Sequence, residues 1–218
     1  MKKSILMQFF RVMITNHIFI SATDTGVGKT HFAIELLKSK LEQGLKLEEL
    51  AYYKVIQCGK PSDYDEVQAS IPGITSYCSY DLAEPASPDY AASLEGVKID
   101  LSQIKQDWHE IKSKHKFVVV EGAGGLAVPI NDAELVSDIA LALDLPLVLV
   151  ISARLGTINQ TLLSVEHAQN KGIKILGIKV SDLDRDQSER ELASLASIQK
   201  ITGLSFCHPE RSLRIPQS

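Results

Sequence analysis

Short, continuous apolar runs recur along the chain, and between them lie stretches whose apolar residues follow the period of an α-helix. Apolar runs without alternation are typical of parallel strands that are buried on both faces. The expected strands are Ile18–Ala22, Leu50–Ile56, Phe117–Val120, Leu145–Ile151 and Ile173–Val180. The expected helices are Thr30–Gln43, Glu134–Leu143, Asn159–Asn170 and Gln187–Gln199. Strands that alternate with helices in this way predict an α/β fold, with a parallel sheet flanked by helices on both faces.

The rest of the chain indicates how the domain is organised. Residues 1–16 are expected to be an N-terminal extension, and residues 17–218 a single domain. A chain of 218 residues with 44% hydrophobic content can bury one sizeable core. Residues 59–89 are richer in Pro, Ser, Asp and Tyr, and are expected to form loops around a short helix. In α/β sheets the loops at the carboxyl ends of strands hold ligands, so the chemistry is sought after each apolar run.

Charge and cysteine content argue against several classes of protein. The net charge of −4, without a long run of lysine or arginine, argues against a nucleic-acid partner. The three cysteines, at positions 58, 78 and 207, show no Cys-x-x-Cys spacing and are interpreted as reduced intracellular thiols. No stretch approaches the roughly 18 apolar residues of a membrane span. These features predict a cytoplasmic protein without a membrane or nucleic-acid partner.

The strongest chemical signal is the sequence Thr-Asp-Thr-Gly-Val-Gly-Lys-Thr at residues 23–30, between the first expected strand and the first expected helix. Such a loop turns backbone N–H groups and the positive end of a helix dipole toward an anion. A Gly-Lys-Thr tripeptide also occurs by chance, and the common P-loop has a glycine where this chain has a threonine at position 23. The flanking strand and helix nevertheless favour a P-loop that binds a nucleoside triphosphate. The residues expected to bind it are Gly26, Val27, Gly28, Lys29 and Thr30. Lys29 is expected to hold the terminal phosphates, and the Thr30 hydroxyl to coordinate Mg²⁺.

Two other strands hold residues that suit phosphate chemistry. Lys54 lies inside an apolar run, where its charge is costly without a partner. It is interpreted as a phosphate-facing lysine, the alternative being a snorkelling lysine of an edge strand. Glu121 follows a buried strand and is interpreted as a second anchor of the Mg²⁺ site, the alternative being a carboxylate that caps a turn. The residues after it, Gly122, Ala123 and Gly124, allow the backbone to approach a phosphate closely.

Two further segments are ambiguous. Asp63, Asp65 and Glu66 form an acidic cluster that, taken alone, is more typical of a solvated face than of metal ligands. The sequence Leu-Gly-Thr-Ile-Asn at residues 155–159 again places a glycine between a strand and a helix. Its N–H groups could hold a second anion such as a substrate carboxylate, although helix capping alone explains its polar residues.

Together, and in this order, these motifs resemble those of the dethiobiotin synthetase family. The resemblance rests on the P-loop sequence, on Tyr53-Lys54 with Gly59, on Glu-Pro-Ala-Ser-Pro at 84–88, on Val-Glu-Gly-Ala-Gly-Gly at 120–125 with Pro129, and on residues 155–159. It covers residues 17–160, with less agreement to residue 182. A threonine at position 23 is itself usual in this family.

The resemblance implies a P-loop α/β fold, Mg²⁺ and the family's reaction. That reaction joins CO₂ (or bicarbonate) and ATP to 7,8-diaminononanoate and closes the ureido ring of dethiobiotin. An amine captures CO₂ as a carbamate, ATP phosphorylates the carbamate, and the second amine displaces phosphate.

The resemblance also implies residue roles and a homodimer. Lys54 and Lys29 would be the catalytic residues. The Mg²⁺ ligands would be Thr30, Asp65 and Glu121, with Asp65 preferred to Asp63 because its downstream apolar spacing matches the family better. The residues that bind the carboxylate tail of the diamine across the dimer would be Gly156, Thr157, Ile158 and Asn159.

This chain departs from the family at several positions. Val55 follows the catalytic lysine, where the family usually has proline. Cys58 stands where the family has a small hydroxyl residue that touches the substrate. Ser181 and Asp182, expected near the nucleotide base, replace an Asn-Asp pair that reads adenine. The departures therefore concern the base and the substrate, whereas the phosphate end agrees with the family.

Two alternative functions are compared with this interpretation. An amidotransferase of the cobyric acid synthase type normally has a glutaminase domain, for which 218 residues leave no room. A non-catalytic or switch-type P-loop ATPase of the partitioning class has an additional lysine near the start of its P-loop and often a basic surface. The stretch from Ser21 to Thr25 contains no lysine, and the chain is acidic.

Overall fold

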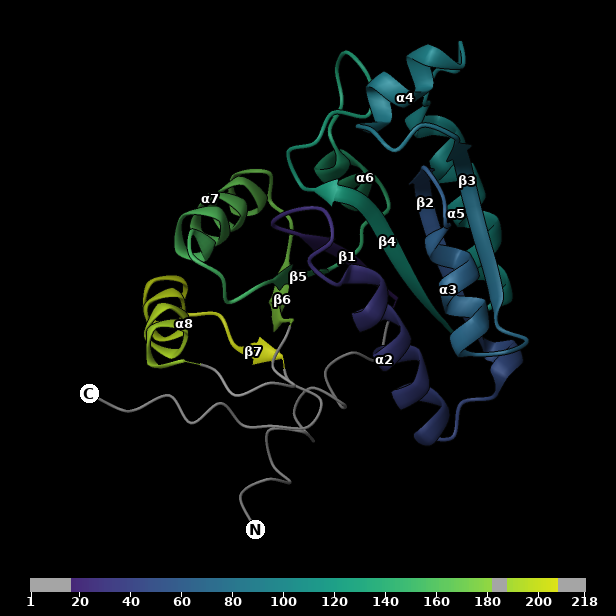
Figure 1. Ribbon diagram of the computed structural model, residues 1–218. Coiled ribbons are helices and arrows are strands. Elements are labelled where there is room, and N and C mark those ends of the chain that lie inside the picture. The colour runs from purple at the N-terminus through teal and green to yellow at the C-terminus, as the bar shows by residue number, and fades with distance from the viewer. Residues whose placement is uncertain (1–16, 182–187, 208–218) are drawn as a thin grey trace.

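One parallel sheet organises the part of the chain that the computed structural model describes, residues 17–181 and 188–207. Within these residues seven strands lie in the order β3-β2-β4-β1-β5-β6-β7, and each neighbouring pair is parallel (Figure 1). The strands are β1 (Ile18–Ala22), β2 (Leu50–Cys58), β3 (Thr75–Leu82), β4 (Phe117–Gly125), β5 (Leu147–Ile151), β6 (Ile175–Val180) and β7 (Phe206–Cys207). The helices are α2 (Lys29–Glu42), the 3₁₀ helix η1 (Leu47–Glu49), α3 (Asp63–Ser70), α4 (Pro88–Leu94), α5 (Leu101–Lys114), α6 (Val136–Ala142), α7 (Thr157–Asn170) and α8 (Glu189–Thr202).

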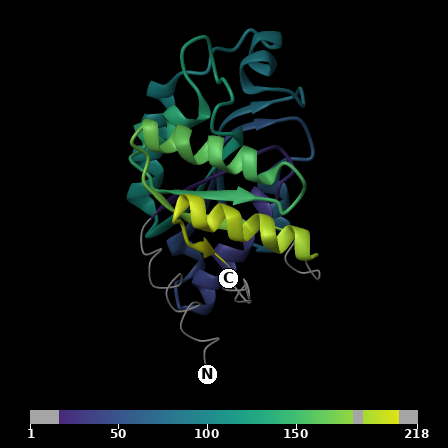
Figure 2. The ribbon, with the colours of Figure 1, turned by 90° about the vertical axis from the view of Figure 1, so that its left-hand side faces the viewer.

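Helices cover both faces of this sheet (Figure 1). On one face α2 and α3 bury Phe32, Leu37 and Val67 against side chains of β1, β2 and β4. The opposite face is covered by α5, α6, α7 and α8, which bury residues such as Trp108 and Ile198. Helices α7 and α8 run side by side over one end of that face (Figure 2). The expected fold class, an α/β sheet with helices on both faces, is confirmed.

The strand order brings three loops together. The chain passes from β1 to β2 and β3, returns to place β4 between β1 and β2, and then adds β5, β6 and β7 on the other side of β1. Because all strands are parallel, their carboxyl ends lie at the same edge of the sheet. Ligands of open α/β sheets bind at this edge, where the strand order reverses. The segments that follow β1, β2 and β4 therefore form the region in which to look for a site.

One expectation about this fold is wrong. Residues 59–89 do contain the expected short helix, α3, but they also contain strand β3, which was expected to be loop. Strand β3 has the sequence Thr-Ser-Tyr-Cys-Ser-Tyr-Asp-Leu and lies at the edge of the sheet, where most of its side chains are only half-buried. An edge strand tolerates such polar residues because it does not have to form a core on both faces.

Several sequence-based expectations lie outside the described residues or at their border. Residues 1–16, the expected N-terminal extension, and Asp182 are not among the described residues. Within the described residues, no helix is both long and apolar enough to cross a bilayer.

Candidate active site at the ends of β1, β2 and β4

The loop between β1 and α2 has the backbone geometry of an anion cradle. Gly26 and Gly28 have φ angles of 70° and 107°, a region that a side chain would strain. Gly28 is the N-cap of α2 and contributes no side chain to cap it, so N–H groups of the first turn remain available to a ligand. Lys29, at the first position of the helix, is buried, with 6% of the residue's surface exposed.

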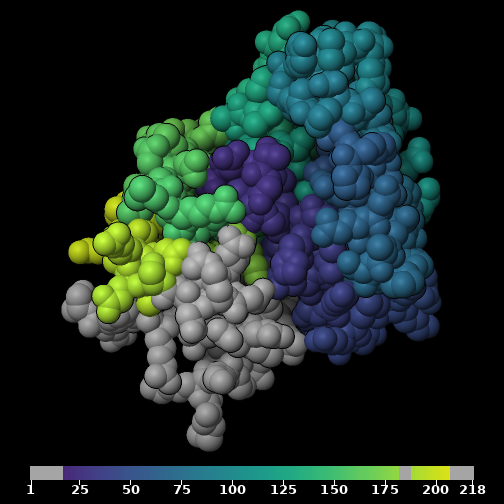
Figure 3. Space-filling view, in the orientation of Figure 1, coloured from purple at the N-terminus to yellow at the C-terminus, as the bar shows by residue number. Residues whose placement is uncertain are grey.

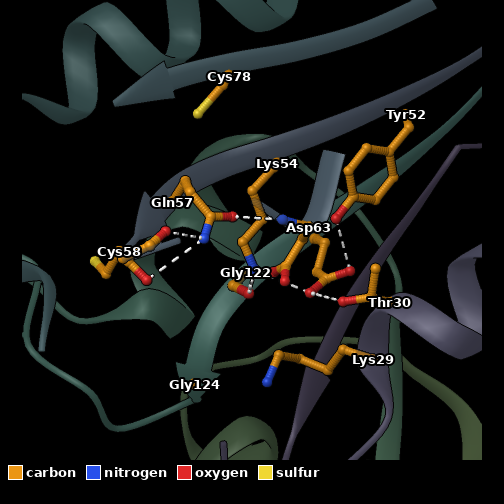
Figure 4. A network of polar contacts seen from close by, with 12 residues as sticks. Lys29, Thr30, Tyr52, Lys54, Gln57, Cys58, Asp63, Cys78, Gly122 and Gly124 are labelled. Atoms are coloured by element: carbon orange, nitrogen blue, oxygen red, sulfur yellow. Dashed lines mark hydrogen bonds and ion pairs between the residues drawn. The ribbon is translucent and has the colours of Figure 1, made fainter. Parts of the chain in front are cut away.

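Behind this loop, Lys54 of β2 and Glu121 of β4 face each other. The two residues are register partners in the sheet, and Lys54 Nζ donates to Glu121 Oε1 at 2.9 Å. The same Glu121 oxygen accepts a hydrogen bond from the Thr30 hydroxyl at 3.2 Å. Thus the P-loop helix and two strands converge on one buried carboxylate. Figure 4 shows Thr30, Lys54 and Asp63 pointing toward one another. The structure thus brings Thr30, Lys54 and Glu121 together, while the roles expected of them stay predictions.

The acidic residue that joins this group is Asp63 and not Asp65. Asp63 Oδ2 lies 2.5 Å from Lys54 Nζ, whereas Asp65 is exposed and does not line the cavity. The helical period explains the difference. Asp63 is four residues before Val67, so it shares the inward face of α3 with this fully buried side chain. The geometry therefore favours Asp63 over Asp65 as the acidic residue of this group.

The two lysines have opposite shifts in pKa. Burial lowers the pKa of Lys29, although the carboxylate of Glu121 acts in the other direction. Burial also acts to lower the pKa of Lys54, but the carboxylates of Glu121 and Asp63 outweigh it and raise that pKa. Lys54 is therefore held as an ammonium ion between two carboxylates.

Two buried side chains that the sequence did not indicate complete the network. The Tyr52 hydroxyl donates to Glu121 Oε2 at 2.9 Å. Gln57 accepts from the backbone N–H of Asp63 at 3.0 Å and donates to the carbonyl of Gly59 at 2.9 Å, so it fixes the loop that leads into α3. The strand alternation could have indicated Tyr52, because residues two apart on a strand share a face and Lys54 was already a candidate.

A cavity of about 650 Å³ is lined by the residues of this network other than Tyr52, namely Lys29, Thr30, Lys54, Gln57, Asp63 and Glu121. Its walls come from the P-loop, the end of β2, the start of α3, residues 85–88 and the end of β4. Cys58 lies in the wall, and burial raises the pKa of its thiol to about 11. In the space-filling view the purple segment that contains the P-loop reaches the surface between the blue and the green parts of the chain (Figure 3). A cavity of this size can hold a nucleotide or a small substrate.

The remaining candidate residues lie away from this cavity or beside the P-loop. The segment from Gly156 to Asn159 forms the start of α7 and does not line the cavity. Within it Thr157 is buried, and its hydroxyl has no hydrogen-bond partner among the described residues. Ser181 follows β6 and lies next to the P-loop, since a Cβ atom added to Gly28 would be 3.3 Å from Ser181 Cβ. The Ser181 hydroxyl donates to the carbonyl of Ile151 at 3.1 Å.

The donor set fits a hard divalent cation. Asp63 and Glu121 already bind one cation, the Lys54 ammonium, and the Thr30 hydroxyl adds a third oxygen beside them. Magnesium prefers such oxygen ligands, and in nucleotide sites it is held by one or two carboxylates together with phosphate oxygens and water. Among the described residues, no group of three or more His, Cys, Asp or Glu side chains is arranged to hold a metal ion.

The sequence of the chain is similar to those of known enzymes. A family profile described as an AAA domain matches residues 16–207. The chain is 36% identical over 171 residues to the ATP-dependent dethiobiotin synthetase BioD of Bacillus velezensis, and the match covers 75% of this chain and 72% of that protein. It is 34% identical over 192 residues to the protein of the same name from Anaeromyxobacter dehalogenans, covering 85% of both.

Solved structures of other proteins share the fold. A chain of the MinC:MinD cell division protein complex from Aquifex aeolicus aligns with a TM-score of 0.55 at 13% identity, covering 88% of this chain and 79% of that chain. A ParA family ATPase from Chlorobium tepidum aligns with a TM-score of 0.52 at 13% identity, covering 90% and 85% of the two chains. At such low identity, this likeness shows a common architecture alone.

Proposed function

The chain belongs to the ATP-dependent dethiobiotin synthetase family, and we propose that the cavity beside its P-loop is where ATP meets the carbamate of a diamine. The protein is a ligase that forms carbon–nitrogen bonds and uses ATP, and the resemblance seen in its motifs is confirmed. The observation that supports the proposed site most is the convergence of Thr30, Lys54, Asp63 and Glu121 next to the P-loop.

In the proposed reaction, one amine of 7,8-diaminononanoate adds to CO₂ and loses a proton, which gives a carbamate. A carbamate oxygen attacks the γ-phosphorus of ATP, and ADP leaves. The second amine then attacks the carbamoyl carbon, the ureido ring closes, and phosphate leaves with the proton of that amine. Each step needs positioned charges more than a covalent nucleophile.

Lys29 and Lys54 have separate roles in this scheme. Lys29 opens α2 directly after the glycine loop, so its ammonium is placed to hold the terminal phosphates together with the N–H groups of the loop. Lys54 lies deeper, at the wall shared by β2 and β4. We assign its ammonium ion to the space between the carbamate and the γ-phosphate when both are bound. The ammonium ions of both residues stabilise the negative charge that develops on the phosphoryl group during its transfer.

We assign Mg²⁺ to Thr30, Asp63 and Glu121, with Asp63 in place of Asp65. The chemistry that Mg²⁺ supplies when bound is neutralisation of charge on the β- and γ-phosphates. The buried carboxylate of Glu121 and the inward-facing carboxylate of Asp63 support this assignment, because both already face a cation in the structure.

We further propose that the protein works as a homodimer in the cytoplasm. The segment from Gly156 to Asn159 is proposed to bind the carboxylate tail of the diamine, yet it does not line the cavity of its own chain. A helix N-terminus attracts carboxylates, and the neighbouring Leu155 side chain is fully exposed. Both features are what a segment that reaches the site of a second copy requires.

The test is a product assay with purified protein, 7,8-diaminononanoate, ¹³C-labelled bicarbonate, Mg²⁺ and ATP. Labelled dethiobiotin should form together with equal amounts of ADP and phosphate, and none should form with a Lys29→Ala variant. ATP hydrolysis that does not depend on the diamine, without dethiobiotin, would support the switch-type ATPase instead.

A further inference from the structure

The two neighbouring tyrosines of β2, Tyr52 and Tyr53, point to opposite faces of the sheet. Both side chains are fully buried. Tyr52 packs into the cluster beneath α2 and α3, whereas Tyr53 packs into the cluster on the other face. Their hydroxyl groups consequently have different partners, Glu121 for Tyr52 and Ser79 for Tyr53.

The Tyr52 hydroxyl makes the two oxygens of the Glu121 carboxylate unequal. Glu121 Oε1 accepts from Thr30 and Lys54, so it is turned toward the P-loop. Glu121 Oε2 accepts from the Tyr52 hydroxyl at 2.9 Å (Figure 4). The Tyr52 ring packs in the core beneath α2 and α3, which fixes the position of its hydroxyl. The hydrogen bond from this hydroxyl therefore orients the Glu121 carboxylate.

We propose that Tyr52 is a positioning residue for the Mg²⁺–ATP site: its hydroxyl holds Glu121 Oε2 and thereby presents Glu121 Oε1 beside the Thr30 hydroxyl. The proposal rests on the proposed function in one respect, the role of Glu121 as a Mg²⁺ ligand. Hydrogen bonds to the ligands of a metal fix their orientation, and removing such a partner typically reduces metal affinity about 10- to 100-fold.

Tyr53→Phe is a matched control for Tyr52→Phe. Each substitution removes one hydroxyl from a fully buried ring of the same strand, and each leaves the ring itself in place. The Tyr53 hydroxyl faces Ser79, on the side of the sheet away from Glu121. A merely structural effect of losing a buried hydroxyl would therefore appear in both variants.

The experiment measures ATP binding by titration calorimetry, once with Mg²⁺ and once with EDTA. Tyr52→Phe should weaken binding of ATP in the presence of Mg²⁺ about tenfold or more, and should leave metal-free binding within about twofold of wild type. Tyr53→Phe should change neither value. Wild-type Mg²⁺ dependence in Tyr52→Phe, or an equal loss in Tyr53→Phe, would overturn the proposal.

Glu121→Gln separates failure of this inference from failure of the proposed function. If Glu121→Gln keeps the wild-type Mg²⁺ dependence, Glu121 is not a ligand, and the proposed Mg²⁺ site and the role of Tyr52 both fail. If Glu121→Gln loses it while Tyr52→Phe keeps it, the role of Tyr52 alone is wrong. In the Glu121→Gln background, Tyr52→Phe should add no further loss, because Tyr52 acts through this carboxylate.

Discussion

Replacement of Lys54 by glutamine removes a cation that lies between two carboxylates. Lys54 Nζ is 2.9 Å from Glu121 Oε1 and 2.5 Å from Asp63 Oδ2. The Glu121 side chain is fully buried, whereas the Asp63 side chain is 29% exposed. The variant therefore leaves one carboxylate without its charged partner in the protein interior and another at its edge. We expect separate effects on stability and on turnover.

The effect on stability follows from burial. Breaking a buried ion pair by removing one partner costs about 3–5 kcal/mol of the free energy of unfolding. Since water reaches Asp63 and screens its charge, we expect the lower end, about 3 kcal/mol. In a domain of this size this corresponds to a fall of about 6–12 °C in the unfolding temperature. The double variant Lys54→Gln/Glu121→Gln should regain part of this loss, because it buries no unpaired charge at position 121.

The effect on turnover follows from the proposed position of the ammonium ion. The ammonium ion stabilises the negative charge that develops as the phosphoryl group is transferred. Its loss should therefore lower turnover about 100- to 1000-fold. Binding of ATP should weaken much less, because Lys29 and the N–H groups of the P-loop remain.

The assay combines thermal unfolding by circular dichroism, ATP binding by calorimetry and phosphate release in the presence of the diamine. Lys116→Gln is the control, because the pair of Lys116 with Glu49 lies at the surface and the Lys116 side chain is 73% exposed. It should leave the unfolding temperature and turnover near those of wild type. Near wild-type turnover in folded Lys54→Gln would refute the catalytic assignment. An unfolding temperature like that of Lys116→Gln would refute the electrostatic reasoning.

Three further predictions concern the substrate, the nucleotide base and the thiols. Asn159→Asp, at an exposed position of the same segment, should raise the KM for the diamine by placing like charges together and leave ATP binding unchanged; steady-state kinetics with each substrate varied measures this, and an unchanged KM would contradict it. Since Ser181 offers one hydroxyl, and that hydroxyl donates to the Ile151 carbonyl, CTP and GTP should support turnover within about 1–3 kcal/mol of ATP. Catalytic efficiencies for the four triphosphates test it, and a preference for ATP beyond about a thousandfold would exceed that range. Because burial raises the pKa of Cys58 and of Cys78 to about 11, few of these thiols are ionised at pH 7, and their alkylation should accelerate about tenfold per pH unit up to that value. Peptide mapping by mass spectrometry follows each cysteine, and a rate that levels off near pH 8 would be the contrary result.

The phosphate end of the site could be predicted from the sequence because its residues are adjacent along the chain or lie in strongly apolar strands. Gly28, Lys29 and Thr30 are consecutive and lie between a strand and a helix, and Lys54 and Glu121 stand out as charges within apolar runs. In the structure the last two are register partners. A charge in a buried strand requires a partner, which is why this signal was informative.

Some elements and residues could not be predicted, because their positions depend on which face of a helix is buried and on which strands are neighbours in the sheet. Asp63 could be told from Asp65 only by knowing which side of α3 faces the sheet, and Val67 supplies that information once the fold is known. Strand β3 lacks an apolar run because it is an edge strand. Helix α5 was not among the expected helices, although the sequence contained signals for it. Asp100 caps the helix, and Trp108 lies on its buried face.

The most direct test of the central claim follows an oxygen atom. If ATP phosphorylates a carbamate made from CO₂, one oxygen of the carbamate must leave with the phosphate when the ring closes. With ¹⁸O-labelled bicarbonate in ordinary water, 7,8-diaminononanoate, Mg²⁺ and ATP, and a brief incubation, mass spectrometry should find ¹⁸O in the released phosphate and in the ureido carbonyl of dethiobiotin. Unlabelled phosphate released alongside labelled bicarbonate would mean that water attacks ATP, and would contradict the assignment of this site to carbamate phosphorylation.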